Sequence, residues 1–299
     1  MVGDIIYLQT ADGKSLYVPD DEVKFLTYGN FGAPPVTFLT RKGYQQHGVT
    51  EIDYLLEPRT ITAELWHSPA CSRQQYWDNR LALHEYLRHN RGGPLLFVLR
   101  QPGGALRALV VRANPGLQIP MPGTDINNWN VDEAVDFLAQ DPIWFDPDGH
   151  SEYVASALDL NLVFPIIFPI RFGIAGSLSE ATITYAGTWV SYPILTLYGP
   201  YAQCIIDNMT TGVRIVLSVA ITGAERRVLT LTPGGQSLVD GFGANRFSDL
   251  DVSSNLVDFC LRPDPEVAGG VNVIQATFVG GTVGASGMQI DWHDRYYAI

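Results

Sequence analysis

Closely spaced acidic residues are the first candidates for chemistry in this sequence, because a glycosidase uses two carboxyl groups that face each other across a cleft. The groups are Asp132, Glu133 and Asp136, then Asp146 and Asp148, then Asp249 and Asp251. The simpler interpretation is that they are solvated acids in turns. A β-sandwich glycosidase is therefore kept only as an alternative.

Metal ligands and nucleophiles give no stronger signal. The stretch 146–149 (Asp-Pro-Asp-Gly) is similar to a calcium loop, but it lacks the third acidic or amide ligand that the EF-hand pattern places before its glycine. The histidines are His47, His67, His84, His89, His150 and His293, and none belongs to an H-E-x-x-H pair. There is also no G-x-S-x-G, P-loop or G-x-G-x-x-G motif. The sequence predicts no enzyme, no catalytic residue, no metal and no cofactor.

Short β-strands are the elements that must position any site. In the first half, the expected strands are Ile5–Thr10, Val36–Thr40, Arg59–Trp66, Leu95–Arg100, Leu106–Arg112 and Val135–Ala139. Within Arg59–Trp66, Ile61, Ala63 and Leu65 alternate with polar residues, as in a half-buried antiparallel strand. One segment differs: Ser72 and Gln75 suggest a capping box, and apolar residues then recur at helical spacing. We expect one helix over Ser72–His89, laid against a sheet.

The second half predicts another all-β region. Its expected strands are Trp189–Tyr198, Cys204–Asp207, Val213–Ile221, Arg227–Leu231, Ser237–Asp240, Leu256–Leu261, Asn272–Val279 and Gly287–Trp292. Short strands with Gly and Pro turns at this spacing are typical of a β-sandwich. Between the halves, Pro165 and Pro169 remove N–H donors from the same edge of one apolar strand, which favours an edge strand or a connector. The expected division is 1–160, a connector at 161–175, and 176–299.

Composition adds a constraint on assembly. The chain has 299 residues, 19 Lys and Arg, and 31 Asp and Glu, for a formal charge of −12. Charged residues make up 17% of the chain, against about 25% in average soluble domains. So few charges suggest that other subunits cover part of the surface. The negative charge disfavours sequence-independent binding to nucleic-acid phosphates.

Signals for compartment are few. The N-terminus has no basic region followed by an apolar run, so no signal peptide is expected. The longest apolar stretch, residues 160–170, is about half the length that spans a bilayer. Cys71, Cys204 and Cys260 are too widely spaced for a disulfide framework, which favours buried free thiols formed in a reducing cytoplasm.

Four segments taken together resemble the distal tail protein family of long-tailed, siphovirus-like bacteriophages. They are residues 42–48 running into 57–62, the helix followed by 92–95, residues 139–145, and residues 187–194 with 198–200, 208–212 and 294–297. The resemblance spans nearly the whole chain in the family's order. Residues 115–130, rich in Pro, Gly and Asn, do not fit the family pattern.

The resemblance implies a mainly β fold with two domains. The N-terminal domain would be a β-sandwich-like belt with one helix, which closes a homo-hexameric ring, and the C-terminal domain a galectin-like β-sandwich. The ring would join the tail tube protein to the tail-tip hub and the receptor-binding proteins, with DNA crossing its lumen. The protein would be made in the host cytoplasm and lie in the virion. Each subunit would use two different faces, because ring closure is a head-to-tail contact.

A carbohydrate-binding module in the C-terminal sandwich is the alternative from a different class. Its proposed stacking platform for sugar rings, or contact surface for a partner, comprises Trp189, Tyr192, Tyr198, Tyr201 and Trp292. Tyr and Trp residues in strands are, however, more often core or interface anchors.

Overall fold

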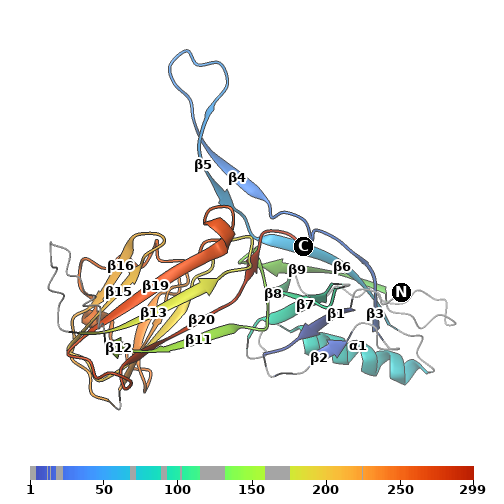
Figure 1. Ribbon diagram of the computed structural model, residues 1–299. Coiled ribbons are helices and arrows are strands. Elements are labelled where there is room, and N and C mark those ends of the chain that lie inside the picture. Colours follow the sequence, from blue (N-terminus) through green and yellow to red (C-terminus); the bar gives the residue numbers. More distant parts are fainter. Residues whose placement is uncertain are drawn as a thin grey trace. The chain divides into compact units, whose positions relative to one another are not determined.

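The computed structural model divides the chain into two compact units (Figure 1). It describes residues 5–11, 13, 15–17, 23–67, 72–88, 93–101, 103–114, 132–158, 176–223 and 225–299. Unit 1 comprises Met1–Pro147 and Tyr296–Ile299, and unit 2 comprises Asp148–Arg295. No described helix is long and apolar enough to cross a membrane. The predicted mainly β fold class is confirmed.

Unit 1 is built on an antiparallel sheet. Its strands are β1 (Ile5–Gln9), β2 (Ser15–Tyr17), β3 (Val23–Tyr28), β6 (Arg59–His67), β7 (Leu95–Arg100), β8 (Leu106–Asn114), β9 (Asp132–Ala139) and β10 (Trp144–Phe145). The order across the sheet is β2-β1-β7-β8-β9-β6-β3, and β10 pairs with β8. The strand β21 (Arg295–Tyr296) returns the chain to this unit.

The core of unit 1 confirms the alternation predicted for β6, where Ile61 and Ala63 are fully buried. The predicted helix is α1 (Arg73–Leu87), and the Ser72 side chain caps it by accepting a hydrogen bond from the Gln75 backbone N–H at 3.2 Å. Leu83 and Leu87 attach α1 to the core that the strands form.

A two-stranded hairpin in unit 1 belongs to neither the main sheet nor the core. It consists of β4 (Val36–Arg41) and β5 (Thr50–Leu56), and we call residues 36–56 the arm. The two strands pair with each other and with no other described strand. All residues of the strands are exposed except Val36 and Leu56, which are half-buried. Figure 1 shows the arm as a ribbon sharing no edge with the sheet.

Unit 2 is a sandwich of two five-stranded antiparallel sheets. One sheet has the order β11-β20-β14-β17-β18 and the other β12-β13-β19-β15-β16. The strands are β11 (His150–Ala155), β12 (Ala157–Leu158), β13 (Gly176–Thr184), β14 (Ile194–Tyr198), β15 (Gln203–Asn208), β16 (Val213–Leu217), β17 (Arg226–Thr230), β18 (Ser237–Asp240), β19 (Val271–Val279) and β20 (Gly287–Trp292). One apolar cluster joins both sheets, with Leu195, Ile206 and Phe278 fully buried. The two sheets therefore share a single core.

The division between the units falls at Pro147, earlier than the expected residue 160. The reason is β11, which the sequence prediction omits and which pairs with β20 of unit 2 along its whole length. The predicted connector at 161–175 and the stretch 115–130 lie outside the described residues.

Three of the predicted strands need correction, and one of them, expected at Val213–Ile221, ends at Leu217. Leu256–Leu261 is no strand: the Asn255 side chain accepts hydrogen bonds from the Val257 and Asp258 backbone N–H groups, and this local turn replaces strand pairing. The strand expected at Trp189–Tyr198 begins only at Ile194, directly after Pro193, which has no N–H to donate to a ladder.

Candidate interaction surfaces

The five aromatic residues predicted as a stacking platform do not share one face. Tyr201 is 2% exposed and packs in the core of unit 2, with its ring centroid 5.5 Å from that of Phe278. Its hydroxyl is buried without a hydrogen-bond partner among the described residues, and burial raises the pKa of Tyr201. Tyr192 and Trp292 are partly buried against the same core. These three residues stabilise the sandwich.

Tyr198 lies on the outer face of β14, since Leu195 and Leu197 of that strand point into the core. Its ring meets that of Tyr153 edge-to-face, with centroids 5.8 Å apart and planes at 75°. The Tyr198 hydroxyl donates to Gln289 Oε1 at 3.0 Å. Tyr153, 52% exposed, was missed by the sequence prediction because its strand was missed.

Trp189 is half-buried and lies in a segment fixed by Tyr185. The Tyr185 hydroxyl donates to the Trp189 carbonyl at 2.5 Å and accepts from the Arg295 backbone N–H at 2.8 Å. A side chain at Gly187 would overlap this hydroxyl and lie 2.6 Å from the Arg295 carbonyl oxygen. The glycine that opens the segment 187–189 is therefore required by packing.

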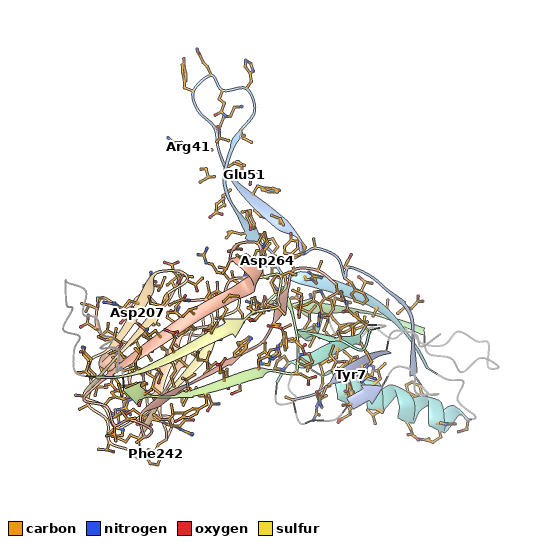
Figure 2. The ribbon with its side chains drawn as sticks, viewed as in Figure 1. Tyr7, Arg41, Glu51, Asp207, Phe242 and Asp264 are labelled. Carbon is orange, nitrogen blue, oxygen red and sulfur yellow. The ribbon has the colours of Figure 1, made fainter. Side chains whose placement is uncertain are left out.

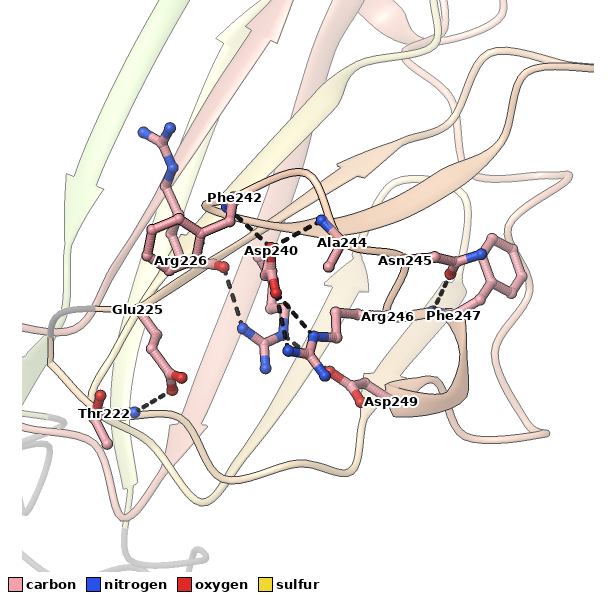
Figure 3. Close-up of polar contacts among 11 residues, drawn as sticks. Thr222, Glu225, Arg226, Asp240, Phe242, Ala244, Asn245, Arg246, Phe247 and Asp249 are labelled. Atoms are coloured by element: carbon pink, nitrogen blue, oxygen red, sulfur yellow. Dashed lines mark hydrogen bonds and ion pairs between the residues drawn. The ribbon is translucent and has the colours of Figure 1, made fainter.

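Among the described residues of unit 2, the most exposed aromatic side chain lies on a tight loop after β18 (Figure 3). The Asp240 carboxylate accepts hydrogen bonds from the Phe242 backbone N–H at 2.9 Å and the Ala244 backbone N–H at 3.0 Å. Arg246 forms an ion pair with the same carboxylate at 2.9 Å. The hydrogen bonds from Ala244 and Phe242, followed by Arg246, lower the pKa of Asp240. Phe242, 98% exposed, stands on this loop.

The far end of the loop is fixed by a second ion pair. Arg227 Nε lies 2.9 Å from Asp249 Oδ2, and both side chains are largely buried at 6% and 13% exposed. Phe247, 42% exposed, begins the 3₁₀ turn that contains Asp249. Aromatic side chains held in place before binding are typical anchors of protein interfaces, because little entropy is lost when a partner covers them.

Comparison with solved structures reveals what this architecture is. The crystal structure of the Dit protein of phage SPP1, described as a paradigm of the hub adsorption apparatus in phages that infect Gram-positive bacteria, matches with a TM-score of 0.64. The match has 13% sequence identity and covers 97% of this chain and 98% of that chain. The chain has the fold of a phage distal tail protein. The predicted resemblance is confirmed at the level of the fold.

Chains in two structures of the phage P2 baseplate in its activated conformation, one with calcium and one with strontium, are similar to this chain as well. They match with TM-scores of 0.53 at 9% and 10% identity, and each match covers 97% of this chain and 98% of the other. By sequence, no protein-family model and no curated protein matches the chain.

Within this distal-tail fold, three of the acidic residues first considered for catalysis have local structural partners. Asp249 pairs with Arg227, and Asp251 accepts hydrogen bonds from the Ser253 backbone and hydroxyl groups. Asp146 lies 3.8 Å from Arg107. The side chains of Asp132 and Glu133 lie outside the described residues. Across the described part of the chain, no three His, Cys, Asp or Glu side chains are grouped as metal ligands.

Two of the three cysteines lie among the described residues. Cys204 and Cys260 are free and buried, and burial raises the pKa of both thiols. Cys71 lies outside the described residues. For the two described cysteines, the prediction of buried free thiols is confirmed.

Proposed function

We propose that this chain is a structural hub of a phage tail tip. Six copies close a ring that joins the tail tube to the tip or baseplate and its receptor-binding proteins. Unit 1 forms the ring, and unit 2 carries contacts to other tail proteins. The observation that carries the proposal is the distal-tail fold itself, which corresponds to the SPP1 hub protein over 97% of this chain and 98% of that one.

The negative charge supports a ring through which DNA passes. Six copies of a chain with a formal charge of −12 carry −72. Proteins hold DNA chiefly through Lys and Arg contacts to phosphates, so an acidic lumen lets the duplex slide without binding. The proposed location is accordingly the virion tail tip, and the proposed role includes no reaction of its own.

The loop at 240–249 supports the proposed contacts of unit 2. It holds Phe242 fully in solvent, with Phe247 and Arg226 exposed on the same part of the sandwich. Aromatic and Arg side chains are the residues most enriched among interface anchors. A receptor-binding or baseplate protein is the partner that a hub would hold there.

Light scattering coupled to size-exclusion chromatography tests the ring. Six chains of 32.9 kDa give an assembly of about 197 kDa. The proposal predicts this mass for the purified chain alone or with the tail tube protein. A chain that stays at the monomer mass under both conditions would contradict it.

Glycan binding by unit 2 is a second candidate function, supported by the pair Tyr153 and Tyr198 on the outer face of one sheet. Gln289 and Asp291 lie beside this pair, and Gln289 Nε2 donates to Asp291 Oδ1 at 2.9 Å. Aromatic rings beside polar groups suit a sugar ring. A glycan array probed with the full chain tests it: binding that disappears in Y153A and Y198A supports the site, and no signal at millimolar sugar removes it.

A further inference from the structure

Residues 296–299 belong to unit 1, although the whole of unit 2 precedes them in the sequence, and we call them the strap. Tyr296 and Ile299 pack against the core of unit 1. The strand β21, which contains Tyr296, pairs with β10. Unit 2 therefore interrupts unit 1, because the 148 residues of Asp148–Arg295 separate the strap from the rest of that unit.

Two arginines of unit 1, one on β6 and one on β8, hold the strap; Figure 2 draws these strands with their side chains. The Arg107 guanidinium lies over the ring of Tyr296, 3.6 Å from its centroid. The Arg59 guanidinium donates to the Tyr297 carbonyl at 3.2 Å and to the Asn30 carbonyl at 3.3 Å. The strap is thus an integral part of unit 1.

Arg59 depends on the strap because its charge is buried. The residue is 1% exposed, and burial lowers its pKa. Within the described part of the chain it forms no ion pair with a carboxylate. The Trp144 ring lies 5.6 Å from its Cζ. A buried cation is strongly destabilising when one of its partners is removed, and the Tyr297 carbonyl of the strap is one of the two carbonyls that it contacts.

The groups around the strap are not fully paired. Arg59 Nε, Arg107 Nε and Trp144 Nε1 are buried N–H groups that have no acceptor among the described residues. Buried polar groups in native proteins nearly always have a partner, and each one that lacks it reduces stability. The strap is therefore held less firmly than a fully paired segment, and its position depends on what holds it from the other side.

Folded unit 2 fixes the residue that precedes the strap. The Arg295 N–H donates to the Tyr185 hydroxyl at 2.8 Å, and the Arg295 carbonyl accepts from the Trp189 backbone N–H at 3.0 Å. Unit 2 also joins its own two ends, since His150 Nε2 lies 3.3 Å from Asp294 Oδ2. The start of the strap is therefore kept close to the start of unit 2 whenever unit 2 is folded.

An unfolded unit 2 would change this situation. The strap would then be attached through a flexible loop of 148 residues. The chance that two chain segments meet falls with about the 3/2 power of the loop length, which is roughly 1,000-fold for a loop of this size. An incompletely paired strap would then leave its position, and the core of unit 1 would remain open.

We propose that the strap is a folding lock, which completes unit 1 only in chains whose unit 2 has folded. Its consequence for assembly rests on the proposed hub function: chains without a folded unit 2 are kept out of the ring. Such a lock is useful because an N-terminal unit emerges first during synthesis and could otherwise associate before the rest of the chain has folded.

Hydrogen exchange followed by mass spectrometry across a urea series tests the lock, because peptides give a separate unfolding midpoint for each unit. Removal of residues 296–299 lowers the midpoint of unit 1 by at least about 1 M and leaves that of unit 2 in place. In R59M, which has no buried charge at this position, the same removal has a clearly smaller effect on unit 1. Equal losses with Arg59 and with Met at this position would contradict the role of the buried cation. The control is A298S, at an exposed residue of the strap, which changes neither midpoint.

Y185F distinguishes a lock from a segment that merely adds packing. It loosens Arg295, so in the full chain it lowers the midpoints of both units, whereas in the chain without the strap it lowers that of unit 2 alone. Y153F is the control. A midpoint of unit 1 that ignores Y185F in the full chain would overturn the proposal.

Mass photometry of the same proteins tests the consequence for assembly. The chain without the strap stays monomeric at concentrations where the full chain assembles. Equal assembly of the two would overturn the lock while leaving the ring intact. A full chain that never assembles would instead overturn the hub function, and the effect of the strap on unit 1 would still be measured by hydrogen exchange.

Discussion

Two tyrosines of unit 2 allow the hydrogen-bond account to be tested with a single type of substitution. Tyr185 and Tyr201 are each 2% exposed and belong to the same core. The Tyr185 hydroxyl bridges the Trp189 carbonyl and the Arg295 N–H, whereas the Tyr201 hydroxyl is buried without a partner among the described residues. Replacing each by Phe removes only the hydroxyl, and the two variants should change stability in opposite directions.

The expected magnitudes follow from these contacts. Y185F removes two hydrogen bonds worth about 1 kcal/mol each and leaves two backbone groups without that partner. The free energy of unfolding of unit 2 therefore falls by about 2–4 kcal/mol. A buried hydroxyl without a partner costs about 1–3 kcal/mol in mutational data. Y201F removes that cost but leaves a small void, so stability stays unchanged or rises by up to about 2 kcal/mol.

Hydrogen exchange followed by mass spectrometry across a urea series is the suitable assay, because its peptides report each unit separately. With a slope of about 2 kcal/mol per molar urea, Y185F lowers the midpoint of unit 2 by roughly 1–2 M. Y153F, which removes the hydroxyl of a side chain that is 52% exposed, is the control and leaves the midpoint in place. Equal destabilisation by Y185F and Y201F would refute the reasoning, because it would mean that the hydroxyl partners do not decide the outcome.

Three further predictions concern unit 2. G187A destabilises the unit by at least about 1–3 kcal/mol through its clash with Tyr185 and Arg295, while G223A, with its nearest contact at 3.6 Å, has little effect; urea midpoints compare them. Burial raises the pKa of Cys204, so the folded thiol stays protonated at a pH where the unfolded thiol ionises. The free energy of unfolding therefore falls as pH rises above about 8.5. C204A flattens this dependence of the unfolding free energy on pH, and an unchanged dependence would contradict the burial argument. Hydrogen bonds lower the pKa of Asp240, so its carboxylate stabilises the folded unit at neutral pH, and this stabilisation is lost as pH falls through the pKa of the folded state. The urea midpoint of D240N therefore differs from that of wild type at pH 7 and converges with it below about pH 4. A difference that stays constant with pH would contradict this prediction.

Much of the β framework was predictable because its inward positions are apolar. Arg59–Trp66 and Leu95–Arg100 were located by alternation and by a buried apolar run, and Ser72 marked the start of the helix. Where the inward positions are polar, the same signal fails. Strand β13 was missed because Ser177 and Ser179, 2% and 1% exposed, occupy buried positions that an apolar pattern would have filled.

The arm shows a different limit of the sequence. The alternation of Ile52, Tyr54 and Leu56 was present, yet alternation predicts one buried face, and here the strand residues are exposed except at the base. No local pattern shows that a strand pairs with only one other and leaves its apolar side chains in solvent. That information comes from the tertiary structure.

The aromatic candidates show why residue type alone did not locate a surface. Tyr198 and Tyr201 are three residues apart, yet one faces outward beside Tyr153 and the other is buried against Phe278. Both residues are tyrosines, so residue type could not distinguish them. Only the strand register and the turn after β14 decide which side chain faces outward and which is buried. Phe242 was not predicted, because its exposure depends on how Asp240 and Arg246 hold the loop.

A cryo-EM reconstruction of the purified full chain tests the hub function most directly. The hub function predicts a closed ring with six-fold symmetry, with unit 1 around an open channel wide enough for duplex DNA. Particles that are monomeric, or that form open filaments, would contradict it.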